Sequence, residues 1–228
     1  MFSVDELQAV TTSLRVASAA VAWSLPFAIA VAYALSRPRF PGKSLLDALA
    51  HLPLVLPPVL IGFLLLLAFG RRGPIGHWLD AVLHVRLAFT MAGAALATAV
   101  MAFPLMVRAI RLSFEAIDAR VFEAAAVLRA GPFDRFLHVA LPLAAPGVLA
   151  GAVTAFAAGL GEFGAVITFA ANVPGQTQTL PLAIYAALQL PDGEAYALHL
   201  AGYSFAFAIA GLAAAEALQR WARARLNA

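Results

Sequence analysis

Residues 123–142 read EAAAVLRAGPFDRFLHVALP and form the longest polar interruption between the apolar stretches of this chain. The segment opens with Glu123 and three alanines, which are good helix formers. It breaks at Gly131-Pro132, and a second short amphipathic run then ends in Leu141-Pro142. The pattern predicts a helix, a turn and a second helix within a loop. A structured loop offers a surface on which another protein can act, so the segment favours a driven transporter over a simple channel.

The composition is that of an integral membrane protein. Of the 228 residues, 63% are hydrophobic and 12% are charged, whereas soluble domains carry about 25% charged residues. The 15 basic residues are spread over the loops without the basic runs typical of nucleic-acid binders, so no nucleic-acid partner is expected. Cysteine is absent, which excludes disulfides and thiolate metal sites. We expect one transmembrane domain over residues 1–228, surrounded by the lipid bilayer.

Five apolar stretches are long enough to cross a bilayer as helices, which takes about 20 residues each. In approximate bounds they run from Arg15 to Leu35, Leu45 to Phe69, Leu87 to Val107, Pro146 to Ala170 and Tyr196 to Leu218. The expected fold class is therefore all-α, an integral membrane protein with five transmembrane helices.

The basic residues are distributed unevenly between the two sides that five spans create. Most of the 15 lie in the loops after the first and third spans and in the C-terminal tail. Because Lys and Arg collect in cytoplasmic loops, the N-terminus is expected outside and the C-terminus in the cytoplasm, with the 123–142 loop on the cytoplasmic side. The outer side holds Arg71, Arg72 and Arg86 in one loop and Arg15 at the edge of a span, and the Arg71-Arg72 pair is the evidence against this orientation.

Gly42-Lys43-Ser44 resembles the end of a phosphate-binding loop but lacks its beginning. Such a loop needs a glycine five residues before Gly42, and position 37 is an arginine. No Ser/His/Asp cluster or metal-ligand spacing appears either, so we expect no catalytic residue, metal site or cofactor in this chain. If ATP drives the protein, the ATPase is a separate chain.

Two polar or irregular features inside the predicted spans are candidates for a transport pathway or gate. Pro57 and Pro58 interrupt the second span, because proline removes a helix hydrogen bond; a kinked packing helix is the alternative. Glu162 is the only acidic residue well inside a span, where a charge usually faces a cavity or a partner. Gly161 and Gly164 flank it and allow close backbone approach, so pure packing is the alternative there.

Hydroxyl side chains within the spans are further pathway candidates, because they can donate hydrogen bonds to an anion without holding it tightly. Such hydroxyls also often bond to their own helix. The candidates are Thr154 and, in addition, Thr90, Thr98 and Ser204.

The 123–142 segment resembles the cytoplasmic signature of the inner-membrane permeases of binding-protein-dependent ABC importers. That signature is EAA, a glycine a few residues later, and a run that ends in Leu-Pro. The matching residues are Glu123, Ala124, Ala125, Leu128, Ala130, Phe136, Leu141 and Pro142. Counted back from Leu141-Pro142, the family glycine falls at Arg129, and the glycine of this chain is displaced to Gly131. We therefore expect the turn to begin slightly later, with Arg129 facing a partner or solvent.

Two further segments narrow the resemblance. LPLVLPPV at residues 52–59 and GEFGAVITF at residues 161–169 are similar to segments of the molybdate permeases and the related tungstate and sulfate permeases. The resemblance implies the type I ABC importer permease fold, a location in the bacterial inner membrane, and a homodimer with the oxyanion path between its subunits. It also implies a cytoplasmic ABC ATPase dimer that binds ATP and Mg, and a periplasmic molybdate-binding protein. The helix near Glu123, in a loop of about residues 115–145, would be the coupling helix seated in a groove of the ATPase.

The leading hypothesis is thus a permease that imports molybdate by alternating access. The spans hold no Lys or Arg in their interiors, which fits a pathway that must release its cargo and leaves tight selection to the binding protein. A tungstate or sulfate/thiosulfate permease is the alternative within the class. An ion-coupled secondary transporter with Glu162 as its ion site, or a membrane scaffold without a transport role, are alternatives of other classes.

Overall fold

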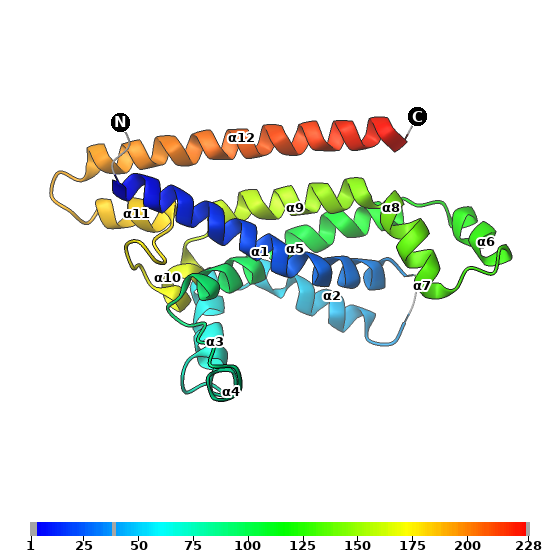
Figure 1. Ribbon diagram of the computed structural model, residues 1–228, viewed down its shortest axis with the longest axis horizontal. Helices are drawn as coiled ribbons and strands as arrows, with labels where there is room; N and C mark the ends of the chain where they lie inside the picture. The colour runs from blue at the N-terminus through cyan, green and yellow to red at the C-terminus, as the bar shows by residue number, and fades with distance from the viewer. Residues whose placement is uncertain (1–3, 38–39, 227–228) are drawn as a thin grey trace.

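The computed structural model describes residues 4–37 and 40–226, and every regular element in these ranges is helical. Four long helices set the length of the molecule and run alongside one another in Figure 1. They are α1 (Val4–Ser36), α5 (Met91–Glu115), α9 (Ala145–Leu160) and α12 (Glu194–Leu226). α1 packs on α5 and α9, α5 packs on α9, and α12 packs on α9.

Small residues allow the long helices to approach closely. Three glycines of α9 face α5: a Cβ on Gly147 would lie 2.3 Å from the Ser113 Cβ, and one on Gly159 would lie 2.8 Å from the Thr98 Cγ2. The third, Gly151, lies over the Met106 carbonyl, which a Cβ would approach to 3.0 Å. Helix packing in a membrane depends on such close contact, because lipid offers no hydrophobic force between helices.

Shorter helices connect the long ones. The α1–α5 connection holds α2 (Lys43–His51), the 3-10 turn η1 (Leu52–Leu54), α3 (Pro58–Phe69) and α4 (Pro74–Leu83). The α5–α9 connection holds α6 (Ala119–Val127), α7 (Pro132–Asp134), the π-helix η2 (Arg135–Ala140) and α8 (Leu141–Leu143). Between α9 and α12 lie α10 (Gly164–Ala170) and α11 (Leu180–Ala187).

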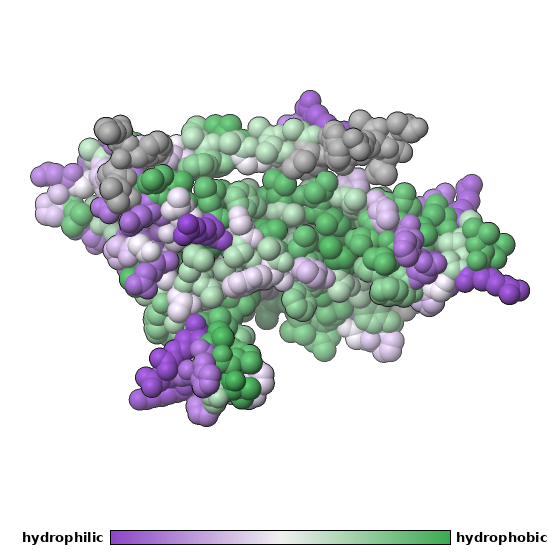
Figure 2. Space-filling view, in the orientation of Figure 1, coloured by the Kyte–Doolittle hydropathy of each residue, from purple (hydrophilic) through white to green (hydrophobic). Residues whose placement is uncertain are grey.

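The two ends of the molecule differ. Figure 1 shows α6 and α7 at the end where α1 and α5 finish and α12 runs toward the C-terminus, while α10 and α11 lie near the N-terminal end. α3 and α4 project to one side at that second end. Figure 2 shows mostly apolar residues over the middle of the long helices, with hydrophilic residues gathered at both ends and on α4. The surface therefore has the banded pattern expected of a protein that spans a bilayer.

The five predicted spans are only partly reproduced. The first and third correspond to the unbroken helices α1 and α5, each long and apolar enough to cross a membrane. The second is bent by 112° between residues 43–54 and Pro58–Phe69, where adjacent prolines interrupt the helix. Within the described residues there are two such helices, or up to four candidate spans if each bent pair counts as one. The count of five is not confirmed; the fifth predicted span lies within α12.

The predicted fourth span, residues 146–170, is wrong as a single helix. α9 ends at Leu160 and α10 begins at Gly164, so Gly161, Glu162 and Phe163 form a break. At its other end, α9 meets the segment Pro132–Leu143 at an angle of 67°.

Candidate functional site

The first half of the α5–α9 connection is a short exposed helix. Asp118 caps it, because its side chain accepts a hydrogen bond from the Arg120 N–H at 2.9 Å, and Asp is among the preferred N-cap residues. The helix predicted to begin near Glu123 therefore exists but begins earlier, at Ala119. Glu123 and Ala124 are exposed, whereas Ala125 is buried against the rest of the loop. The capping Asp118 was the signal for the earlier start.

The turn after α6 is built on Arg129. This residue has a φ of +59°, in the left-handed region that favours glycine. The Ala130 N–H bonds to the Ala125 carbonyl at 3.0 Å, and the Arg129 N–H bonds to the Ala126 carbonyl at 3.0 Å. These two bonds are the 6→1 and 5→2 pair of a Schellman motif, with Arg129 at the position that glycine usually occupies.

The displaced glycine does not move the turn. Gly131 has a φ of −67° and a ψ of 166°, an extended conformation open to any residue, and a Cβ there would meet nothing within 4 Å. The expectation that the turn begins later, at Gly131, is therefore wrong. α6 ends at Val127, and exposed Arg129 makes the turn where the family glycine was expected. Residue type alone misled the prediction, because L-residues can adopt this conformation at a cost.

The second half of the connection is anchored to the long helices. The Phe136 ring lies 4.6 Å from the Tyr33 ring of α1 and 6.5 Å from the Phe114 ring of α5, measured between centroids. Tyr33 and Phe114 are themselves 5.2 Å apart in an edge-to-face arrangement. Arg135, the preceding residue, stabilises the turn, since its Nε donates to the Ala130 carbonyl at 3.0 Å. The predicted signature residue Phe136 thus joins the loop to two long helices.

The Leu-Pro end of the predicted signature closes this second half. The N–H of half-buried Leu141 bonds to the Phe136 carbonyl, five residues back, as in a π-helix. Pro142, which is exposed, has no N–H with which to continue the α-helical pattern. Ala140, the last residue of the π-helix, is fully buried in the core formed with α1 and α5.

The tip of the connection exposes large apolar side chains. Val127 is 83% exposed, Leu128 is 82% exposed and Phe133 is 74% exposed. Leu128 was predicted as a site residue, whereas Val127 and Phe133 were missed, although their apolar type beside a polar turn was a usable signal. Large apolar side chains exposed around a polar turn indicate a surface for a partner protein. We call Val127, Leu128 and Phe133 the apolar tip.

Two separately predicted pathway features lie in contact at the other end of the molecule. Pro57 caps α3 and Pro58 is its first residue. A Cβ on Gly164, the first residue of α10, would lie only 2.7 Å from the Pro58 Cβ. A Cβ on Gly62 would likewise lie 2.6 Å from the Ala165 carbonyl oxygen. The two glycines therefore let the start of α10 seat directly on α3.

Glu162 lies in the helix break and not inside a continuous helix. Its Oε1 accepts a hydrogen bond from the Ala165 N–H at 2.9 Å, so the carboxylate satisfies a free backbone donor at the start of α10. The side chain is half-buried. Gly161 before it is exposed, and a Cβ there would find its nearest neighbour at 3.7 Å. Capping is thus one role of Glu162, and a role in a gate stays a prediction.

The hydroxyl candidates divide into two groups. Thr154 is exposed on α9 and donates to the Ala150 carbonyl at 2.8 Å, and Thr90 caps α5 by accepting from the Gly93 N–H at 3.1 Å. The Thr98 and Ser204 hydroxyls are buried and find no hydrogen-bond partner among the residues that the structure describes. A pathway role for any of them stays a prediction. The part of the chain that the structure describes holds no group of His, Asp and Glu suited to a metal.

These elements form two sites joined by one helix. α9 runs from the anchored half of the α5–α9 connection to the break at Glu162, beside which α10 seats on α3 (Figure 1). α9 is therefore the single helix between the connection and the Glu162 break. Such an arrangement suits a membrane protein in which a partner at one end drives a change at the other.

The fold is shared with chains of solved bacterial ABC transporters. The chain superposes with a TM-score of 0.72 on a chain in the crystal structure of a bacterial ABC transporter involved in the import of the acidic polysaccharide alginate. That match covers 97% of this chain and 80% of that chain at 16% sequence identity. A second structure, of a bacterial alginate ABC transporter in complex with alginate pentasaccharide-bound periplasmic protein, matches with a TM-score of 0.69 over 96% of this chain and 77% of that chain.

The chain belongs to the family of binding-protein-dependent transport system inner membrane components, whose model matches residues 24–224. The resemblance noted in the sequence is thereby confirmed, as is a place in the inner membrane. The molybdenum transport system permease protein ModB of Escherichia coli (strain K12) is 52% identical over 220 residues, 96% of each chain. ModB of Haemophilus influenzae is 48% identical over 222 residues, 97% of each chain. The probable sulfate transport system permease protein cysT of Nephroselmis olivacea is 36% identical over 166 residues, 73% of this chain and 58% of that protein.

Proposed function

We propose that this chain is the permease subunit of an ATP-driven importer that carries molybdate across the inner membrane. The observation that carries the proposal is the 52% identity to a molybdenum transport permease over 96% of both chains. The match to the sulfate permease is lower, at 36%, and covers less of each chain. That difference favours molybdate over sulfate as the cargo.

A separate ABC ATPase dimer, with ATP and Mg bound to it, would supply the energy, and α6 would be the coupling helix. The apolar tip supports this role, because Val127 and Leu128 are more than 80% exposed and stand where α6 ends, at one end of the molecule (Figure 1). The contact of Phe136 with Tyr33 and Phe114 would carry motion of the loop to α1 and α5. α9 would carry the same motion to the Glu162 break.

The proposed orientation places the N-terminus outside and the C-terminus in the cytoplasm. In Figure 1 the α6 end of the molecule is also the end toward which α12 runs, and the N-terminus lies at the other end. A cytoplasmic ATPase at α6 then leaves α11 and its neighbouring loops for a periplasmic molybdate-binding protein. A structural neighbour has been solved with a periplasmic protein bound, which supports such a docking. A second copy of the chain would complete the cargo path between the two subunits.

Uptake into vesicles tests the cargo. The chain is reconstituted with its ATPase and binding protein, and labelled molybdate uptake is followed with and without excess sulfate. We expect uptake to require ATP and to be insensitive to sulfate. Equal competition by sulfate would show that the cargo assignment is wrong. If tungstate competes and sulfate does not, the relative affinities for molybdate and tungstate decide which of the two anions is the cargo.

Co-purification tests the class. We expect an ATPase to be retained with the tagged chain, and the substitution Glu123→Lys on exposed α6 to abolish ATP-dependent uptake. If no ATPase is retained and Glu123→Lys leaves uptake intact, an ion-coupled transporter or a scaffold is the better description.

A further inference from the structure

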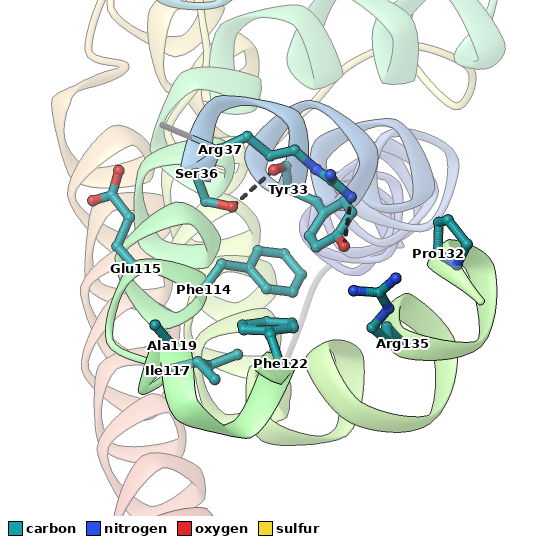
Figure 3. Close-up of a pocket in the computed structure, with 10 residues that line it drawn as sticks. All are labelled: Tyr33, Ser36, Arg37, Phe114, Glu115, Ile117, Ala119, Phe122, Pro132 and Arg135. Atoms are coloured by element: carbon teal, nitrogen blue, oxygen red, sulfur yellow. Dashed lines mark hydrogen bonds between the residues drawn. The ribbon is translucent and has the colours of Figure 1, made fainter. Parts of the chain in front are cut away.

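A cavity of about 450 Å³ lies between the ends of α1 and α5 and the loop that carries α6 (Figure 3). Its aromatic side is formed by Tyr33, Phe114 and Phe122, and Arg37 and Arg135 line it from α1 and the π-helix η2. Figure 3 shows the two guanidinium groups on either side of the Tyr33 hydroxyl. The cavity thus combines an apolar floor with two positive charges from elements far apart in the sequence.

The two arginines are held in place by neutral groups of the protein. Arg37 donates through Nη2 to the Tyr33 hydroxyl at 2.9 Å, and its guanidinium carbon lies 4.9 Å from the centre of the Tyr33 ring. Arg135 donates through Nε to the Ala130 carbonyl at 3.0 Å. No carboxylate of residues 4–37 and 40–226 forms an ion pair with either one. Each side chain therefore keeps N–H donors for a ligand.

The acidic residue in the lining does not compete for these charges. Glu115 lies across the cavity from the arginines in Figure 3 and accepts a hydrogen bond from the Arg111 Nε at 2.7 Å. Its charge is thus already matched by a third arginine. The uncompensated charge of the cavity is that of Arg37 and Arg135, about two positive charges on adjacent walls.

Guanidinium groups recognise tetrahedral oxyanions through paired N–H donors, and restrained arginines lose little freedom on binding. A phosphate group between Arg37 and Arg135 would balance both charges, and the aromatic floor would accept the apolar part of the molecule that carries the phosphate. The cavity lies beside the loop that carries α6, at an end of the molecule where hydrophilic residues adjoin the apolar middle of the long helices (Figures 1 and 2). Both acidic phospholipids and small soluble phosphates reach such a position.

We propose that this cavity binds a phosphate group between Arg37 and Arg135, carried by an acidic phospholipid headgroup or by a small soluble phosphate. The bound group would tie the end of α1 to the π-helix and so stiffen the attachment of the α5–α9 connection. The proposal does not depend on the cargo, and its test does not measure transport.

The test uses the purified full-length chain. In one arm, the chain is extracted from bilayers of phosphatidylcholine containing phosphatidylglycerol, and native mass spectrometry measures the phosphatidylglycerol that stays bound. In the other arm, the chain in pure phosphatidylcholine nanodiscs is titrated with inorganic phosphate and glycerol phosphate by calorimetry. We expect saturable binding in at least one arm, and that arm identifies the source of the phosphate.

Substitutions locate the binding. Arg37→Gln and Arg135→Gln should each weaken it by about tenfold or more, since a hydrogen bond to a charged group is worth that much. Arg120→Gln removes the same charge from a side chain that is 88% exposed and outside the cavity, and should leave binding unchanged. Arg37 is exposed, so its variant decides the matter even if loss of the Arg135 bond disturbs the loop. No binding in either arm, or equal loss in Arg120→Gln and Arg37→Gln, would overturn the proposal.

Discussion

Among single residues, Arg129 differs most from expectation, because it adopts a left-handed conformation that glycine usually adopts. A non-glycine residue in the left-handed region costs roughly 1–2 kcal/mol, yet the two Schellman bonds form around it. The nearby Gly131, which could adopt that conformation freely, is extended instead. The backbone of the loop is therefore determined by hydrogen bonds and by the Arg135–Ala130 contact, and it does not follow the glycine.

Replacing Arg129 should accordingly stabilise the loop. We expect Arg129→Gly to lower the free energy of the folded turn by about 0.5–1 kcal/mol, less than the full strain because glycine also loosens the unfolded chain. Hydrogen exchange at the Ala130 amide, which bonds to the Ala125 carbonyl, measures the effect directly. Gly131→Ala is the matched control and should change exchange little, since its surroundings are open. Slower exchange in the control than in Arg129→Gly would contradict this account.

The sequence predicted which residues belong to the α5–α9 connection better than how that connection folds. Glu123, Leu128 and Phe136 could be named from a short motif. The left-handed conformation of Arg129 could not be predicted. It depends on backbone hydrogen bonds to the carbonyls of Ala125 and Ala126, which the residue types do not indicate. Of the apolar tip, only Leu128 was predicted. Val127 and Phe133 were missed because their exposure follows from where the turn begins.

At the scale of elements, the breaks in the predicted spans have physical causes that hydropathy does not report. An apolar run of suitable length predicts a span but says nothing about bends within it. Pro57 and Pro58 signalled the 112° bend before α3, whereas Glu162 between glycines was interpreted as a charge inside a helix. The structure instead uses Glu162 to cap α10. Polar and glycine residues inside an apolar run therefore indicate a break as readily as a buried site.

The contact between α10 and α3 should be intolerant of even a methyl group. We expect Gly164→Ala to destabilise the folded protein by about 1–3 kcal/mol, because the new Cβ would lie 2.7 Å from the Pro58 Cβ and the two elements must move apart. Gly161→Ala, three residues earlier, is the control and should be nearly neutral, since the nearest atom is 3.7 Å away. Denaturation of the purified chain in detergent compares the two. Equal unfolding midpoints would show that the helices can adjust.

The aromatic contact of Phe136 should govern coupling more than assembly. Phe136→Ala removes the ring that lies against Tyr33 and Phe114, which should weaken the attachment of the loop by about 1–2 kcal/mol. Because the apolar tip is unchanged, ATPase binding should persist while cargo moved per ATP hydrolysed falls. Phe136→Leu keeps an apolar side chain there and should retain more of the coupling. An unchanged ratio of transport to hydrolysis in Phe136→Ala would exclude this path.

Considered as a whole, the molecule has two polar ends with different features, separated by an apolar middle. One end presents the apolar tip, the other holds α10, α11 and the Glu162 break, and α9 connects them. Charge asymmetry predicted which loops share a side, and Figure 1 groups the same segments at one end. The number of spans was predicted less successfully, because the chain bends between α2 and α3 and α3 projects from the bundle. Where such an element lies depends on its packing partners.

The exposed apolar tip predicts where the ATPase binds. Leu128→Ser should weaken binding of the partner ATPase by about tenfold or more, as expected when a central apolar anchor of an interface is lost. The fold should be unaffected, because Leu128 is 82% exposed and contributes little to the core. Leu190→Ser is the matched control: that leucine is 63% exposed and follows α11 at the opposite end. Binding of the purified ATPase to the chain in nanodiscs measures both. If Leu190→Ser weakens ATPase binding and Leu128→Ser does not, the ATPase docks at the other end, and the proposed orientation must be reversed.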